Sequence, residues 1–99
     1  MTDKIDLGAL PRFDAADYLT TPERQADYLS QALEDGDDAE IRRALGAIAR
    51  ARGMTGVAEA TAMNRQSLYV ALSDQGNPAF STVTKLVRAM GLKLTVQPQ

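Results

Sequence analysis

Residues 54–88, MTGVAEATAMNRQSLYVALSDQGNPAFSTVTKLVR, constrain the fold more than any other part of this 99-residue chain. Apolar residues recur here at spacings of three and four, which is the period of an amphipathic helix. The period is interrupted at residues 62–64 and again at Gln75-Gly76-Asn77-Pro78, whose composition is typical of a turn. The pattern predicts a short helix, a tight turn, a second helix, a loop and a third helix.

The residues before this segment predict further helices. Residues 13–19 suit one or two helical turns with Asp14 as the cap, and Thr21-Pro22 begins a helix that runs to about Asp35. We expect this helix to bury an apolar stripe that consists of Ala26, Leu29, Ala32 and Leu33. Asp37 caps the next helix, and Gly53 ends it. Thr55, Asn64 and Ser81 are predicted to cap the later helices.

The chain ends on a predicted strand, because Leu92-Lys93-Leu94-Thr95-Val96 alternates apolar and polar residues. A strand needs a partner edge, and no second strand is evident. We therefore predict that residues 92–97 pair with a second copy of the chain, through Leu92, Leu94 and Val96, or with another protein. A frayed terminus is the alternative.

These elements give one domain, divided as follows: residues 1–12 a flexible tail, 13–53 acidic N-terminal helices, 54–73 a helix-turn-helix pair, 81–91 a supporting helix and 92–97 the strand. The chain has no cysteine and no histidine, so it lacks disulfides and the commonest general base and metal ligand. No apolar run is long enough for a membrane span, and the N-terminus does not resemble a secretory signal. We expect a cytoplasmic protein that has no cofactor, no metal and no membrane contact.

The net charge of −2 conceals two halves of opposite sign. Residues 1–39 hold three cations and ten anions, a net −7, and residues 40–99 hold eight cations and three anions, a net +5. Acidic helices are commonly just a solvated surface. The sharper interpretation is that the first half meets a basic partner and the second half an acidic one.

The pair of helices at 54–73 has the spacing of a helix-turn-helix DNA reader. Ala58 is small enough for a close helix crossing, Met63 anchors the turn, and Leu68 and Leu72 hold the second helix from behind. Residues on the outer face are then free to meet base edges, as arginine does with guanine and glutamine with adenine. The candidates for base contact are Arg65, Gln66, Tyr69 and Val70, and those for phosphate contact are Thr55, Asn64, Ser67, Ser81, Thr82 and Lys85. The alternative is a helical bundle whose polar surface touches nothing.

At these residues the chain resembles the Xre-type, HigA-like antidote proteins of bacterial addiction modules. The resemblance covers nearly the whole chain and is strongest in LYVALSDQGNPAF followed by KLVRAMGLKL. It implies an all-α, five-helix, Xre or lambda-repressor-like helix-turn-helix domain with a short C-terminal strand that pairs across a homodimer. It also implies an antitoxin that neutralises a RelE/ParE-type toxin and represses its own operon by binding operator DNA. The candidate toxin contacts are Phe13, Tyr18, Leu19, Glu23, Asp27 and Tyr28.

The sequence departs from the family pattern at three positions. Ala62 stands where the turn usually has glycine, and a left-handed conformation there costs alanine about 1 kcal/mol. Asn64 replaces a common serine, which is a mild change because both are good caps. Gly56 replaces a longer polar residue, often glutamine, so one phosphate contact is lost if that side chain normally makes it.

Two other functions remain open at this point. A stand-alone Xre-type regulator has the same features without a toxin partner. An enzyme has only clustered carboxylates to draw on, Glu34, Asp35, Asp37 and Asp38, and although such groups can bind Mg²⁺ or Ca²⁺, acids are expected at a helix start. We therefore predict a binding protein that has no small-molecule substrate and is not an enzyme.

Overall fold

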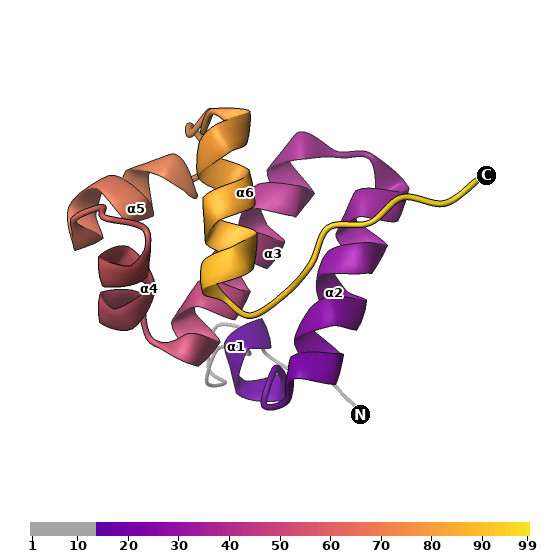
Figure 1. Cartoon of the computed structure of the whole chain (residues 1–99), viewed down its shortest axis with the longest axis horizontal. Coiled ribbons are helices and arrows are strands. Elements are labelled where there is room, and N and C mark those ends of the chain that lie inside the picture. The colour runs from indigo at the N-terminus through magenta and orange to yellow at the C-terminus, as the bar shows by residue number, and fades with distance from the viewer. Residues whose placement is uncertain (1–13) are drawn as a thin grey trace, which may run out of the picture.

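The computed structural model describes residues 14–99 and is all-helical in that part of the chain (Figure 1). Its helices are α1 (Ala15–Tyr18), α2 (Pro22–Asp35), α3 (Asp38–Arg52), α4 (Met54–Ala60), α5 (Arg65–Ala71) and α6 (Phe80–Ala89). The all-α prediction is confirmed. Residues 14–99 hold six helices instead of five, because the turn expected after Asp14 is a helix of its own. The predicted tail at 1–12 and the toxin-contact candidate Phe13 lie outside the described residues.

Helix α3 is the centre of the fold. It packs against α1, α2 and α4, and α4 in turn packs against α5 and α6. Residues 44–49 of α3 are all buried. Leu19, Leu68 and Leu86 bring α1, α5 and α6 to the same core, and each fully buried leucine is worth about 1.5–3 kcal/mol relative to exposure. In Figure 1, α4 and α5 lie at one end of the molecule and α2 lies at the other.

Side-chain caps begin four of the helices in residues 14–99, as the sequence predicted. Asp14, Thr21, Asp37 and Asn64 each accept a hydrogen bond from a backbone N–H in the first turn of the helix that follows. Such caps satisfy donors that the helix itself leaves unpaired. The predicted stop after Asp35 is also confirmed, because Gly36 adopts a left-handed conformation with φ 75°.

Two predicted helix starts are wrong. Helix α4 begins at Met54 instead of after a Thr55 cap, and α6 begins at Phe80 instead of after Ser81. Their N-cap residues, Gly53 and Ala79, make no side-chain cap hydrogen bond. Gly53, with φ 103°, ends α3 and begins α4 at once, so no position is left between the helices for a hydroxyl cap.

The predicted apolar stripe of α2 is only partly buried. Leu29 is 4% exposed, but Leu33 is 43% exposed and Ala26 is exposed too. Gln25 occupies the inner face that the stripe was expected to fill. Its amide donates to the Leu19 carbonyl at 3.1 Å, and its oxygen accepts from Arg52 at 2.9 Å. Hydrogen bonds at both ends of the amide make this burial of a polar group tolerable.

The predicted C-terminal strand at 92–97 is not seen. The segment is extended and runs beside α2 in Figure 1. The N–H of Leu92 donates to the Val87 carbonyl at 3.0 Å, but among residues 14–99 no backbone hydrogen bond follows that one along the chain. The reason is the one noted in the sequence: the described part of this chain offers no second strand with which to pair.

Candidate functional site

Helices α4 and α5 are joined by a tight turn at residues 61–64. Thr61 is buried, and its hydroxyl donates to the carbonyls of Val57 at 2.9 Å and Ala58 at 3.1 Å. The N–H of Met63 returns to the Ala58 carbonyl at 2.9 Å. The buried Ala58, at 3% exposure, stands where the sequence placed a small residue at the helix crossing. The turn is thus fixed by hydrogen bonds to the last turn of α4.

Ala62 is the one residue other than glycine with a positive φ in residues 14–99, at 58°. The left-handed turn conformation predicted for this position is confirmed. Gly56, the other departure in this segment, is exposed, and a Cβ added to it would meet nothing within 4 Å. A longer side chain at position 56 would therefore extend into solvent without disturbing the core.

Helix α5 is anchored on one side and free on the other. Asn64 caps it by accepting from the Ser67 N–H at 2.7 Å, and Leu68 and Leu72 are 0% and 8% exposed behind it. The predicted base contacts and Ser67 all lie on the exposed side: Arg65, Gln66, Ser67, Tyr69 and Val70. The predicted division of this helix into an inner and an outer face is confirmed.

Arg65 rests on Tyr69 of the same helix. Its guanidinium carbon lies 5.6 Å from the ring centroid, and one nitrogen lies 3.4 Å from the phenolic oxygen. Both side chains are exposed, and a cation–π contact at an exposed site is worth only about 0.5–1 kcal/mol. The stacking holds the guanidinium on the outer face at a small cost to release.

A hollow of about 400 Å³ adjoins the outer face of α5. Gln66, Ser67 and Val70 line it from the helix, and residues 75–78 line it from the following loop. Sequence reasoning identified this loop only as a turn, since its composition carries no signal of what it faces. Gly76 is required there because an added Cβ would lie 2.2 Å from the Ala71 carbonyl oxygen.

The remaining DNA-contact candidates are scattered on α4 and α6. Thr55, Ser81 and Lys85 are exposed, and Thr82 is half-buried. None of them lines the hollow beside α5. Sequence reasoning missed Phe80, which is 76% exposed at the start of α6; its wrong assignment to the loop before a Ser81 cap concealed it.

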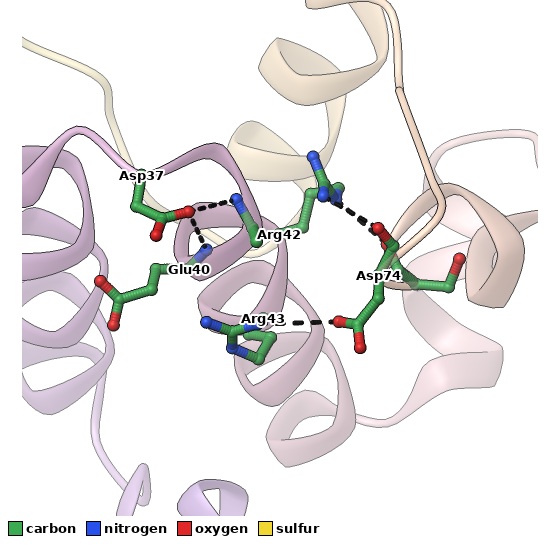
Figure 2. A network of polar contacts seen from close by, with 7 residues as sticks. Asp37, Glu40, Arg42, Arg43 and Asp74 are labelled. Atoms are coloured by element: carbon green, nitrogen blue, oxygen red, sulfur yellow. Dashed lines mark hydrogen bonds and ion pairs between the residues drawn. The ribbon is translucent and has the colours of Figure 1, made fainter.

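The guanidinium of Arg42 on α3 points toward Asp74, just after the end of α5 (Figure 2). It donates to the backbone carbonyls of Ser73 at 3.0 Å and Asp74 at 3.1 Å, just after the helix ends. Arg43 adds a longer ion pair to the Asp74 carboxylate at 3.7 Å. Cations at a helix C-terminus are favoured by the helix dipole. Arg42 is half-buried, whereas Arg43 is exposed.

Arg50 and Arg52 of α3 have partners in the acidic first half of the chain. Arg50 binds the Asp14 carboxylate through two nitrogens, at 2.9 and 3.3 Å. This hydrogen bonding, together with the Ala16 N–H, lowers the pKa of Asp14 below its ordinary value of 3.8. Arg52 donates to Gln25. The two arginines therefore connect α3 to α1 and α2.

Three of the toxin-contact candidates share one hollow on α2. Tyr18, Asp27 and Tyr28 line a space of about 540 Å³. Glu23 is exposed but does not line it. Leu19 is 1% exposed and packs in the core, so its selection as a direct contact is wrong. Leu19 follows the short helix α1, and sequence spacing alone does not show whether a leucine at such a helix end is buried or exposed.

A sequence profile described as "probable addiction module antidote protein" matches residues 9–98. The chain belongs to this family of antidote proteins. An uncharacterized protein of Haemophilus influenzae is 43% identical over 88 residues, which cover 89% of this chain and 91% of that relative. No solved structure matches the chain. The antidote role in an addiction module, and with it a toxin partner in general, follows from the family.

The antidote chain shows two further features in residues 14–99. No helix there is long and apolar enough to cross a membrane. No group of three or more carboxylates there is arranged to hold a metal ion.

The dimer candidates differ from one another, because Leu92 is partly buried against the core whereas Leu94 and Val96 are 37% and 98% exposed.

Proposed function

We propose that this antidote protein represses its own operon through an Xre-type helix-turn-helix formed by α4 and α5, and neutralises a RelE/ParE-type toxin. The observation that carries the DNA half is the outer face of α5. Its residues are exposed and, apart from Val70, carry polar groups, while buried leucines anchor the helix from behind and Asn64 caps its start. A recognition helix needs this combination, because the base-contacting side chains must be both free and fixed in direction.

The exposed residues of α5 suit the edges of base pairs. Arg65 can make a bidentate contact to guanine and Gln66 one to adenine, and each good pair is worth about 1–3 kcal/mol of discrimination. Val70, at 61% exposure, offers an apolar surface to a thymine methyl group. Tyr69 keeps the guanidinium of Arg65 in place until DNA arrives. The loop at 75–78 lines the same hollow as Gln66 and Val70, so it would lie close to DNA bound by α5.

Contacts to phosphate would fix the register of the protein on the duplex. We propose Thr55, Asn64, Ser67, Ser81, Thr82 and Lys85 for this role. Gly56 has no side chain to contribute to this set, although the structure has room for one at that position. Arg50 and Arg52 of α3 are left out of this set, because both already bind residues of the acidic first half.

The toxin half of the proposal is supported by the family and by charge. The helices before residue 40 are acidic, and a basic protein partner would be steered toward them. Binding, and not catalysis, is the proposed activity, since the chain has neither histidine nor cysteine. We further propose that the chain acts as a homodimer, which matches the two-fold symmetry of most operators.

The Arg65→Ala/Gln66→Ala double variant tests the DNA half of the proposal. Fluorescence anisotropy with DNA from upstream of the gene should show a loss of about 10²-fold or more in affinity, because two bidentate contacts are removed. Arg24→Ala/Gln31→Ala is the matched control, since it removes the same two side-chain types from the exposed side of α2. Equal operator affinity of the wild-type protein and the α5 variant would exclude α5 as the reader.

A further inference from the structure

Two adjoining hollows on α2 form one groove, which we call the Tyr28 groove. They measure about 540 Å³ and 180 Å³, and both are lined by Tyr28 and Gln31. The larger is closed on one side by Tyr18 of α1, and the smaller by Glu40 and Arg43 of α3. The groove therefore follows the α2 surface between its two neighbouring helices.

The groove carries more acidic than basic side chains. Asp27, Glu34, Asp35 and Glu40 line it, and none of them forms an ion pair with another residue of 14–99. Its two cations are already engaged within the protein. Arg43 pairs with Asp74 at 3.7 Å, and Arg24 stacks on Tyr18 and donates to Thr20 at 3.0 Å. The charge left for an incoming ligand is negative, which favours a cationic occupant.

Two of these acids lie at the unfavourable end of their helix. Glu34 and Asp35 occupy the last turn of α2, which has no basic residue. The negative end of the helix dipole repels carboxylates there, so their presence opposes the stability of α2. The fold does not require these two charges, whereas a cationic partner does make use of them.

The stacking of Arg24 on Tyr18 shows that a phenol ring at this surface can bind a guanidinium group. The guanidinium carbon of Arg24 lies 5.0 Å from the centroid of that ring, a distance typical of a cation–π contact. Tyr28, half-buried against the core, provides a second phenol in the same groove. Aromatic rings beside carboxylates form a surface that binds arginine by stacking and by charge together.

We propose that the Tyr28 groove is the docking site for an arginine-bearing segment of a protein partner. Resting on the function proposed above, that partner is the toxin. Helix α2, which forms one wall of the groove, and α5 lie at opposite ends of the molecule in Figure 1. We therefore expect a segment docked on α2 to leave the DNA-reading helix uncovered. The inference adds Gln31, Glu34, Asp35 and Glu40 to the expected toxin contacts and removes Leu19 from them.

Charge reversal at Glu34 tests the groove, and Glu59 provides a matched control. Each is an exposed carboxylate at the next-to-last position of a helix, Glu34 in α2 and Glu59 in α4. Because arginine suits a helix C-terminus, neither replacement should unfold the protein. With the toxin encoded beside this gene as the probe, calorimetry should show affinity lower by about 30-fold or more for Glu34→Arg, because like charges then meet across the interface. Glu59→Arg should bind the toxin as the wild-type chain does.

A second pair of variants tests the shape of the groove. Gln31→Trp fills it and should weaken toxin binding while operator binding is kept; Gln66→Trp on α5 should do the reverse. If the wild-type chain binds the toxin and both groove variants bind it equally well, the Tyr28 groove is not the docking site, and the antitoxin function stands. If the wild-type chain binds no toxin, the proposed function itself fails and the groove has no such partner.

Discussion

Ala62 stores strain in the turn before the proposed recognition helix. Its φ of 58° is a conformation that costs an L-residue about 1–2 kcal/mol. Ala62→Gly should therefore raise the free energy of unfolding by up to about 1 kcal/mol, since glycine adopts this conformation freely and loses only some unfolded-state entropy. Urea denaturation followed by circular dichroism measures the change. Ala60→Gly, two residues earlier at the last residue of α4, should instead lower stability, by up to about 1 kcal/mol. The same sign for both variants would mean that the turn is unstrained.

Arg42 is a positioning residue for α5, which it reaches through the backbone of Ser73 and Asp74. Arg42→Met keeps an unbranched apolar stem and removes both hydrogen bonds. We expect the free energy of unfolding to fall by about 1–2 kcal/mol and operator affinity to fall about 10-fold, because hydrogen bonds from charged groups are lost and the end of α5 is released. Arg43→Met is the control, since its exposed ion pair contributes little. Operator titrations below the midpoint of unfolding separate the two effects. If Arg42→Met binds operator DNA with the same affinity as Arg43→Met, the hydrogen bonds of Arg42 are not needed to position α5.

At the scale of the element, α1 is held to α3 by the ion pair between Asp14 and Arg50. The hydrogen bonds from Arg50 and the Ala16 N–H lower the pKa of Asp14, so the carboxylate favours the folded state. A lowered folded-state pKa gives stability that is present above the unfolded value of 3.8 and is lost as pH falls through the folded value. We therefore expect the protection of the Leu19 amide from hydrogen exchange to decrease as pH falls below about 4. Asp14→Asn should abolish this dependence, and Asp17→Asn, one turn later on α1, should keep it. Protection that is equally acid-sensitive in Asp14→Asn would assign the effect to another group.

The helices also show how far local sequence patterns reach. The caps at Thr21, Asp37 and Asn64 and the stop at Gly36 act within three or four residues, and the sequence predicted each of them. The same holds for the two faces of α5. The partners of Arg42, Arg50 and Arg52 lie 27 to 36 residues away in the chain. No helical period encodes such pairs. The contacts of Arg42 with the end of α5 and of Arg50 with Asp14 therefore could not be predicted from the sequence, because they depend on how α3 packs against its neighbours.

For the whole molecule, the arrangement in space keeps the charge split of the sequence. The acidic α2 lies at one end and the proposed DNA-reading helix at the other, with the buried α3 between them (Figure 1). All four arginines of α3 have partners within residues 14–99. Arg42 and Arg43 bind the segment just after α5, and Arg50 and Arg52 bind residues of the acidic first half. The two proposed binding surfaces are thus separate faces of one core, and a variant of one surface should leave the other intact.

We propose that a second copy of the chain meets the first at the C-terminal segment. Residues 92–95 line a hollow together with α2, and after Leu92 the segment makes no backbone hydrogen bond to residues 14–99. Val96 is 98% exposed, and Leu33 and Leu94, which line one hollow, are 43% and 37% exposed. An extended edge with apolar side chains is a template for pairing with another strand. Two such segments in antiparallel contact would bury these side chains and supply the edge that each strand lacks.

Deletion of residues 93–99 should therefore convert a dimer to a monomer in sedimentation equilibrium. Leu92 must be kept, because its N–H binds Val87 and its side chain packs on the core. In the full-length chain, Val96→Asp should weaken the dimer by the cost of a buried charge, whereas Gln97→Asp, on the next exposed residue, should change it little. Operator affinity should fall in parallel with dimerisation, since two linked half-site contacts bind more tightly than one. A truncated chain that still sediments as a dimer would place the interface on the helices, and Val96 would then have no role in dimerisation.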